Sequence, residues 1–299
     1  MTLPTLDELL ALRGSARKLS LRAGGPARGL LAGGHHSVHR GRGLEFQEVR
    51  PYVAGDDPRS IDWRVTARRG KPHTKLFREE RERPVWLVAD LRANLFFGSR
   101  RQLKSAVVVR GAALLAWAGA LAGDRVGAVL AGASGHRVLP PRSREAGVLP
   151  ILTALIDTQP TAPGDSSSPG FGDALRALAP LVRPGSVVLA LSDFSEPEPS
   201  DGAPWPALAA HNECRLFWVT DALEEQGLPN GRFRVGLPGR LRVIDGAEVR
   251  GRWLESWRAR QARIEALGQR IGVPIIRLDT SEPVEDTLRA TLRGGEIAA

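Results

Sequence analysis

The sequence predicts an α/β fold in which helices cover both faces of a mostly parallel sheet. Short continuous apolar runs, typical of strands buried on both faces, alternate with longer helical patterns from residue 84 onward. Three of these runs end directly at an aspartate, namely Asp90, Asp193 and Asp221. The 299 residues include 42% hydrophobic and 25% charged side chains, so the chain can bury a core and whole-chain disorder is excluded.

The first 80 residues follow a different pattern. Residues 3–21 place their leucines mostly on one helical face, which predicts a helix. Residues 22–43 are rich in glycine, arginine and histidine without periodicity, so we expect a surface loop there. Residues 44–53 and 73–78 alternate as strands do, and the polar stretch 54–70 between them is dense in turn formers.

Beyond residue 84 the alternation of strands and helices is regular. We expect strands at residues 85–89, 125–131, 186–192, 214–220 and 273–278. We expect helices at residues 101–122, 146–157, 171–181, 251–272 and 285–292, and a hairpin over residues 233–243 that turns at Pro238-Gly239. Ligands of such sheets bind beyond the carboxyl ends of the strands, so the edge with the three aspartates is the expected place for a site.

Charge and cysteine content narrow the classes of function. The formal net charge is +9 and arginine supplies nearly all of the positive charge, which suits an acidic partner, although GC-rich coding would produce the same enrichment. The single cysteine, Cys214, excludes an internal disulfide and lies in an apolar strand, so a buried thiol is favoured over a nucleophile. The apolar stretch 106–123 is interrupted by Arg110, and no targeting pattern opens the chain, so we expect no membrane span and a cytoplasmic location.

Two stretches resemble a known bacterial family. GRGLEFQEVRPYVAGDDPRSIDWRVTARRG at residues 41–70, followed by FREE at 77–80, resembles the signature of the domain-of-unknown-function family fifty-eight. LVADLRANLFFGS at 87–99 and GDRVG at 123–127 resemble the downstream half of that family, which is similar to a von Willebrand factor A domain. The resemblance implies an N-terminal helix, loop and signature region over residues 1–80 and a von Willebrand A-like domain over residues 81–299.

The resemblance also implies a partner. Members of family fifty-eight are commonly encoded beside MoxR-type AAA+ ATPases. The implied function is a non-catalytic, protein-binding adaptor that works with such an ATPase in the assembly or maturation of other proteins.

Von Willebrand A domains usually hold Mg²⁺ with an Asp-x-Ser-x-Ser loop, a threonine and a later aspartate, because Mg²⁺ prefers about six oxygen ligands. Here the loop contains Asp90, Arg92 and Asn94, and Asp193 matches the later aspartate. Arg92 offers only donors and a permanent positive charge, and the threonine has no clear counterpart in residues 166–168. We therefore expect a vestigial site formed by Asp90, Asn94 and Asp193, no cofactor, and at most weakly held Mg²⁺.

Two interpretations of Arg92 remain open. Its guanidinium can occupy the position of the cation, paired with Asp90 and Asp193, and offer its donors to an acidic partner. Alternatively, Arg92 points into solvent and the site has decayed. Serine at positions 92 and 94 would restore Mg²⁺ binding if the rest of the site were intact.

The signature region carries a second cluster. Asp56, Asp57 and Asp62 can form the acid–base pair of an unrecognised hydrolase, or a metal site with His35, His36 and His39. The favoured interpretation is structural: the aspartates cap backbone amides, Asp62 bonds a nearby arginine, and Trp63 anchors the loop to the core. We expect contacts with the partner from Asp90, Arg92 and Asp193 and from the signature residues Arg50, Tyr52, Asp56, Asp57, Arg59, Asp62 and Trp63.

The late helix is strongly basic. Arg252, Arg258 and Arg260 accompany Trp253 and Trp257, a combination that can bind nucleic acid. The favoured interpretation is that the two tryptophans face the core and the arginines face water.

Overall fold

The computed structural model describes residues 1–21, 44–53, 56, 58–79, 82–164, 170–195, 204–236, 239 and 241–293. The chain forms two compact units, one from Met1–Gly29 with Arg83–Ala299 and the other from Leu30–Glu82. The larger unit contains the sheet, and the smaller one contains most of the signature region.

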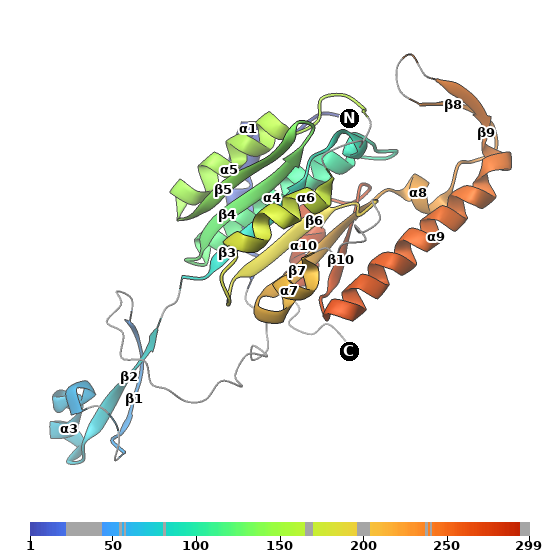
Figure 1. Cartoon of the computed structure of the whole chain (residues 1–299). Helices are drawn as coiled ribbons and strands as arrows, with labels where there is room; N and C mark the ends of the chain where they lie inside the picture. The colour runs from blue at the N-terminus through green and yellow to red at the C-terminus, as the bar shows by residue number, and fades with distance from the viewer. Residues whose placement is uncertain are drawn as a thin grey trace. The chain divides into compact units, whose positions relative to one another are not determined.

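The larger unit is built on a sheet of six strands in the order β10-β7-β6-β3-β4-β5 (Figure 1). The strands are β3 (Pro84–Asp90), β4 (Arg125–Gly132), β5 (Gly135–Ser143), β6 (Val187–Ser192), β7 (Glu213–Thr220) and β10 (Ile275–Asp279). All neighbours pair in parallel except β5, which runs antiparallel to β4 at one edge. The predicted mostly parallel α/β fold is confirmed. Because the chain moves outward from β3 to β5 and then returns to β6 on the other side of β3, the sheet has a topological switch point between β3 and β6.

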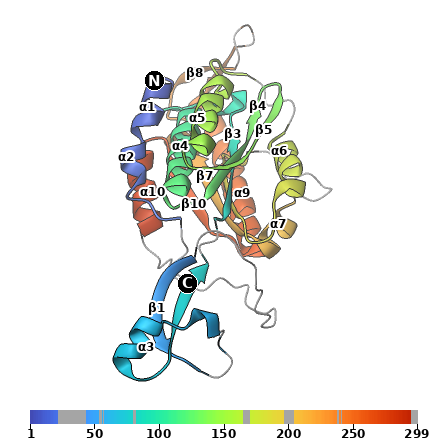
Figure 2. The ribbon, with the colours of Figure 1, turned by 90° about the vertical axis from the view of Figure 1, so that its left-hand side faces the viewer.

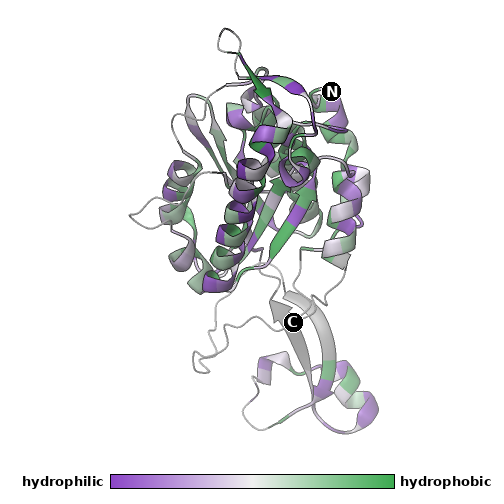
Figure 3. Cartoon of the chain, turned by 90° about the vertical axis from the view of Figure 1, so that its right-hand side faces the viewer, coloured by the Kyte–Doolittle hydropathy of each residue, from purple (hydrophilic) through white to green (hydrophobic). Residues whose placement is uncertain are grey.

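Helices cover both faces of this sheet (Figure 2). One face packs against α1 (Leu6–Ala11), α2 (Arg13–Ala16), α4 (Lys104–Leu121), α5 (Glu145–Thr158) and α10 (Val284–Arg293). The other face packs against α6 (Phe171–Leu178), α7 (Trp205–His211) and the C-terminal part of α9 (Gly246–Ile271). Side chains of β3 alternate between the two cores, with Leu87 in the first and Trp86 and Val88 in the second, as the two-residue period of a strand requires. Figure 3 shows apolar residues concentrated on the sheet and hydrophilic ones along the outer side of α9.

Helix α4 is long and apolar enough to cross a membrane by length and composition alone. However, 83% of its residues are buried inside the structure, as is usual for the central helix of a core. Its apolar character is accounted for by packing on both sides.

The first helices belong to the sheet unit. The stretch predicted as one helix over residues 3–21 forms α1 and α2, and Leu9, Leu12 and Ala16 are buried in the first core. Trp117 Nε1 on α4 donates a hydrogen bond of 3.0 Å to the carbonyl oxygen of Leu9. The region expected over residues 1–80 therefore differs from the structure at its start, since residues 1–21 pack on the sheet rather than with the signature.

Several smaller elements complete the larger unit. The expected hairpin is present as β8 (Arg232–Val235) and β9 (Arg242–Asp245), which pair antiparallel. The edge strand β5, the helix α7 and the short helix α8 (Ala222–Gln226) were not expected from the sequence. The 3-10 turns η2 (Ala93–Leu95) and η3 (Ala179–Leu181) also belong to the larger unit, whereas η1 (Pro58–Ser60) belongs to the smaller one.

The smaller unit is an antiparallel ribbon with a helix between its strands. The strands β1 (Leu44–Pro51) and β2 (His73–Glu79) confirm the two predicted strands, and α3 (Trp63–Arg69) connects them. Asp62 caps the start of α3, and Gly70 ends it with a left-handed φ of 69°. Among the side chains described in this unit, only His73 and Thr74 are buried, and the hydrogen bond from the His73 backbone N–H to Thr66 Oγ1 connects β2 to α3.

Candidate functional site

Three buried aspartates lie side by side at one edge of the sheet. Asp90 ends β3, Asp193 follows β6 and Asp221 follows β7, as the sequence predicts. The strands are neighbours in the sheet, and the side chains are between 0% and 3% exposed. Buried charges need bonded partners, so the arrangement around each carboxylate decides what this edge can do.

Asp90 is held by Arg92 in a bidentate pair. Arg92 Nε is 2.8 Å from Asp90 Oδ1, and Arg92 Nη2 is 2.8 Å from Oδ2. Ser192 Oγ donates a further hydrogen bond of 2.7 Å to Asp90 Oδ2. Burial alone would lower the pKa of Arg92, but the hydrogen bonds and charge of Asp90, with the charge of Asp193, raise it above its ordinary value. Arg92 is only 3% exposed, so the alternative in which it points into solvent is wrong.

Asp193 has a cation of its own. Lys104 Nζ is 3.2 Å from Asp193 Oδ2 and 2.6 Å from Glu224 Oε2, and the lysine is 1% exposed. Burial alone would raise the pKa of Asp193, but the nearby ammonium lowers it below its ordinary value. Burial likewise opposes the charge on Lys104, and the two carboxylates raise its pKa. Of the expected guanidinium shared by both aspartates, the structure shows the direct ion pair of Arg92 with Asp90, while Asp193 acts on Arg92 through its charge and takes its direct ion pair from Lys104.

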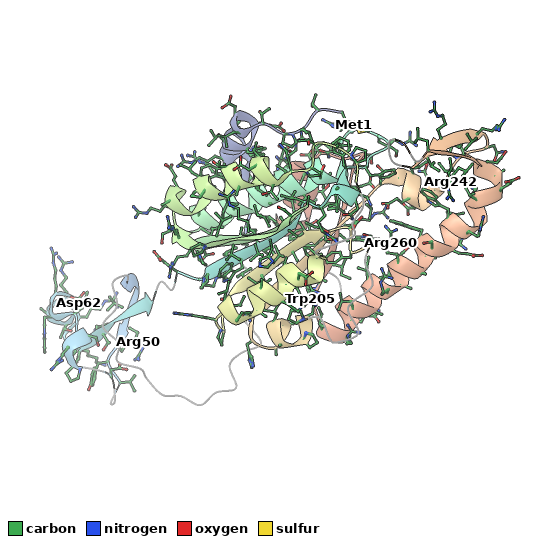
Figure 4. The ribbon with its side chains drawn as sticks, turned by 45° about the horizontal axis from the view of Figure 1, so that its top comes forward. Met1, Arg50, Asp62, Trp205, Arg242 and Arg260 are labelled. Atoms are coloured by element: carbon green, nitrogen blue, oxygen red, sulfur yellow. The ribbon has the colours of Figure 1, made fainter. Side chains whose placement is uncertain are left out.

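The network extends to the long helix. Arg260 Nη1 on α9 is 3.0 Å from Glu224 Oε1, so two cations bracket Glu224. Figure 4 shows where Arg260 lies on α9. Lys104 is the first residue of α4, where the helix dipole disfavours a positive charge. The carboxylates of Asp193 and Glu224 offset this cost at the same helix end.

The loop after β6 fixes the position of Asp193. The backbone N–H of Ser195 donates to Asp193 Oδ1 at 3.0 Å, and that of Phe194 donates to Ser192 Oγ at 3.0 Å. Phe194 adopts a positive φ of 45°, which is uncommon for a residue with a side chain. The turn is thus specified by side-chain bonds to its own backbone.

These residues do not fit a divalent cation. Both oxygens of Asp90 accept bonds from Arg92, and Asp193 is engaged by Lys104 and by backbone. Asn94 Nδ2 donates to Ser195 Oγ at 3.3 Å, and its Oδ1 is a buried acceptor without a hydrogen-bond partner, the one neutral oxygen left from the expected vestigial site. Within the described parts of the chain, no three His, Cys, Asp or Glu residues gather as metal ligands. Residues 166–168 and His35, His36 and His39 lie outside the described residues.

Asp221 serves the fold. It caps the start of α8 by accepting from the backbone N–H of Leu223, and it accepts hydroxyl hydrogen bonds from Ser99 and Thr280. Burial would raise the pKa of Asp221, but these hydrogen bonds lower it. The third aspartate therefore connects the loops after β3, β7 and β10 and is not available to a substrate.

The signature carboxylates also cap backbone. Asp56 accepts from the Val53 backbone N–H at 3.0 Å and from Arg50 Nη2 at 2.7 Å, and these bonds hold the pKa of Asp56 below its ordinary value. Asp62 Oδ1 accepts from the first backbone amides of α3, those of Arg64 and Val65, at 3.0 and 3.1 Å. These contacts agree with the structural interpretation of the cluster.

Other signature residues are placed differently from expectation. Trp63 is 69% exposed, so the expectation that it anchors the loop to the core is wrong: α3 turns Val65 and Thr66, which are half-buried, and not Trp63 toward its inner side. Tyr52 is half-buried and its backbone N–H donates to the Pro72 carbonyl at 2.9 Å. Arg59 is exposed on η1, and Asp57 lies outside the described residues.

The tryptophans of α9 face the protein. Trp257 is buried and stacks on Trp218 with ring centroids 5.2 Å apart, and Trp253 Nε1 donates to the Glu224 carbonyl. Arg252 and Arg258 are exposed, as the amphipathic interpretation expects, whereas Arg260 is half-buried because it pairs with Glu224. Cys214 is buried, and burial raises the pKa of its thiol to about 12, which makes it a poor nucleophile.

Sequence reasoning did not assign Lys104, Glu224 or Ser192 to this site. A signal for Lys104 is present in the sequence: it is one of only four lysines and directly precedes a largely apolar stretch, so its burial would require a carboxylate partner. Glu224 and Ser192 carry no such signal, because their roles depend on contacts between distant parts of the chain.

Comparison with known proteins identifies the family. Residues 48–236, more than half of the chain, match the family described as protein of unknown function DUF58. The chain belongs to this family. The predicted resemblance is confirmed at that level, and the match covers both the signature of the DUF58 chain and most of its sheet.

Relatives of this DUF58 chain include uncharacterized proteins of Mycobacterium bovis and Mycobacterium tuberculosis. Each is 34% identical over 214 residues, a match that covers 70% of this chain and 65% of the relative. The chain thus spans just under two thirds of the length of these relatives. Among solved structures, an aerotolerance-related membrane protein from Bacteroides fragilis is similar, with 14% identity, coverage of 71% of this chain and 98% of that one, and a TM-score of 0.46. The conserved hypothetical protein BatB from Bacteroides thetaiotaomicron has 14% identity, coverage of 71% and 97%, and a TM-score of 0.43.

Proposed function

We propose that this DUF58 protein is a non-catalytic, protein-binding adaptor built on a von Willebrand A-like domain whose cation has been replaced by side chains. The observation that carries the proposal is the pairing at the switch point: Arg92 neutralises Asp90 and Lys104 neutralises Asp193, both within the protein interior. A parallel sheet with one antiparallel edge strand and helices on both faces supports the choice of domain.

The chemistry of this edge favours binding over turnover. A general base needs a carboxylate or imidazole that can accept a proton near neutral pH, whereas the pKa of Asp193 is lowered by its partners and Asp90 is held by Arg92. Ser192 Oγ donates to a carboxylate that Arg92 already neutralises, so the hydroxyl has no base to activate it among its described contacts. The site is a rigid ionic network rather than a set of reactive groups.

The proposed partner is a MoxR-type AAA+ ATPase, which the resemblance to family fifty-eight implies. Such a partner uses ATP, so the proposal includes a cytoplasmic location. In a domain that uses an adhesion cation, a carboxylate of the partner completes the coordination of the metal. Since Arg92 and Lys104 already pair with the carboxylates of Asp90 and Asp193, binding of the ATPase should not require a divalent ion on this chain.

The test is direct binding between the purified chain and the MoxR-type ATPase encoded by the same genome, measured by biolayer interferometry. The nucleotide-free arm is essential, because EDTA also removes Mg²⁺ from ATP. We expect equal affinity with Mg²⁺ and with EDTA in that arm. Absence of binding in every nucleotide state would contradict the adaptor, and loss of binding in EDTA without nucleotide would contradict the replacement of the cation.

A further inference from the structure

The smaller unit presents an exposed basic surface with one aromatic residue on it. We define the α3 surface as Trp63, Arg64, Arg68, Arg69 and Lys71, all of which are exposed. Trp63 is the most exposed large hydrophobic residue among those described, at 69%. The four cations make no side-chain hydrogen bond or ion pair to any part of the chain that the structure describes, so their charges face solvent.

The scaffold under this surface is ordered without help from Trp63. Asp62 caps α3, Thr66 Oγ1 accepts from the backbone N–H of His73 at 3.0 Å, and Gly70 closes the helix in the left-handed region. Residue 61 bridges Thr74 on β2 in the antiparallel sense. Because backbone and polar bonds fix the helix, the backbone that carries the indole is prearranged, which lowers the entropy cost of binding through it.

The charge pattern indicates the chemistry of the partner. Arg64 and Arg68 are four residues apart on one helix, a spacing at which like charges repel each other. Arg69 and Lys71 add two more positive charges, while Asp62 is turned inward to cap the helix. An acidic surface would relieve this repulsion, and arginine forks match carboxylates well.

We propose that the α3 surface docks on an acidic face of the protein partner, with the Trp63 indole in an apolar pocket and the exposed cations of the same short segment paired with carboxylates beside it. This inference rests on the proposed adaptor function and names the docking element within it. It differs from the sequence expectation, because Arg50, Asp56 and Asp62 hold the scaffold and do not form the contact surface. A central aromatic residue surrounded by arginines is the usual composition of an energetic centre in protein interfaces.

The geometry favours a protein over a membrane or a nucleic acid. Helix α3 has seven residues and shows one large outward apolar side chain, which is too little apolar area for a helix that lies in a lipid interface. The exposed Trp63 indole needs an apolar pocket beside the acidic groups, which a folded protein offers and the outside of a nucleic-acid duplex does not.

The experiment compares full-length variants for binding to the ATPase of the proposed function. Trp63→Ala should weaken the affinity about 30-fold or more, as truncation of a central aromatic anchor does. Arg68→Glu/Arg69→Glu should weaken it about 10-fold or more, mainly through a slower on-rate and a reduced dependence on salt. The matched control is Arg252→Glu/Arg258→Glu, which makes the same change of charge at exposed positions on α9 and should leave the affinity within about twofold of wild type.

Folding of each variant is checked by circular dichroism and thermal unfolding, and Trp63→Phe provides a milder version that should retain partial affinity. If the wild-type chain binds and the α3 variants bind equally well, the inference is overturned while the adaptor stands. If the wild-type chain does not bind, both fail. Vesicles containing phosphatidylglycerol and a 20-base-pair DNA duplex are run in parallel at physiological salt. Binding of wild type to either probe that the α3 variants lose, with ATPase binding unchanged, would also overturn the inference.

Discussion

Replacement of Lys104 by methionine tests the ionic network most directly. Methionine keeps the length and apolar character of the side chain but removes the ammonium that contacts Asp193 and Glu224. Glu224 retains its ion pair with Arg260, whereas Asp193 is left in the interior with backbone and neutral donors. Nearly all of the effect should therefore come from Asp193.

The expected loss is about 3–5 kcal/mol of unfolding free energy at pH 7, because removing one partner strands a buried charge. The loss should also depend on pH. In wild type the folded pKa of Asp193 is lowered, so its contribution is present above the unfolded pKa and disappears as the pH falls through the folded value. In Lys104→Met the folded pKa should rise above the unfolded value of about 4, so the variant gains relative stability as the pH falls. The difference in unfolding free energy between wild type and Lys104→Met should be largest near pH 7 and smaller near pH 5.

Urea unfolding followed by tryptophan fluorescence measures the difference, since Trp86, Trp117 and Trp257 are buried in the larger unit. Arg137→Met is the control: Arg137 pairs with Asp157 at 3.4 Å, but both side chains are more than half exposed, so the change should cost less than about 1 kcal/mol. Lys104→Met/Asp193→Asn should recover much of the loss, because no unpaired charge remains at Asp193. A deficit below 1 kcal/mol for Lys104→Met, or one that stays constant from pH 7 to pH 5, would refute the reasoning.

Three further predictions follow from contacts elsewhere in the larger unit. Arg92→Ser/Asn94→Ser should show no heat of Mg²⁺ binding in calorimetry, because the ammonium of Lys104 still engages Asp193; addition of Lys104→Ser should produce measurable binding, and heat from the double variant would contradict this account. Cys214 should react with Ellman's reagent only after unfolding, because burial raises the pKa of the thiol to about 12; rapid labelling of the native protein would disprove its burial. Leu9→Ala should lower the unfolding free energy by about 2–5 kcal/mol in urea titrations, since Leu9 is fully buried against the sheet unit; an unchanged midpoint would show that the first helices are dispensable.

The sequence predicts most of the sheet because its strands are buried on both faces. Apolar runs such as those of β3 and β6 leave no other place for these residues than a core. The edge strand β5 was not recognised, because it is largely exposed and contains Pro140 and Pro141, which are disfavoured in strand interiors but tolerated at an edge. The short helix α7 was also not recognised, because two helical turns contain too few residues to show a clear apolar period.

The sequence predicts the aspartates of the candidate site but not the cationic side chain that pairs with Asp193. Asp90, Asp193 and Asp221 follow strands whose carboxyl ends meet at one edge, so their proximity follows from the fold class alone. The pairing of Lys104 with Asp193 joins residues 89 positions apart and depends on how α4 packs over the loop after β6. The exposure of Trp63 was likewise outside the reach of sequence pattern, because an isolated tryptophan beside turn residues is compatible with either side of a surface.

Where side chains take the place of the metal ion in an adhesion site, the energy of binding to a partner has to come from another surface. A metal ion at the sheet edge would present an open coordination position to a partner carboxylate. Arg92 and Lys104 instead donate to Asp90 and Asp193 and are almost fully buried, so they stabilise the edge and leave little exposed charge for a partner. A partner must then find its main attraction on another surface. The α3 surface, with four exposed cations and an exposed indole on one short segment, has the charge and the apolar area for that role, and for this reason Trp63 rather than Arg92 is expected to control affinity.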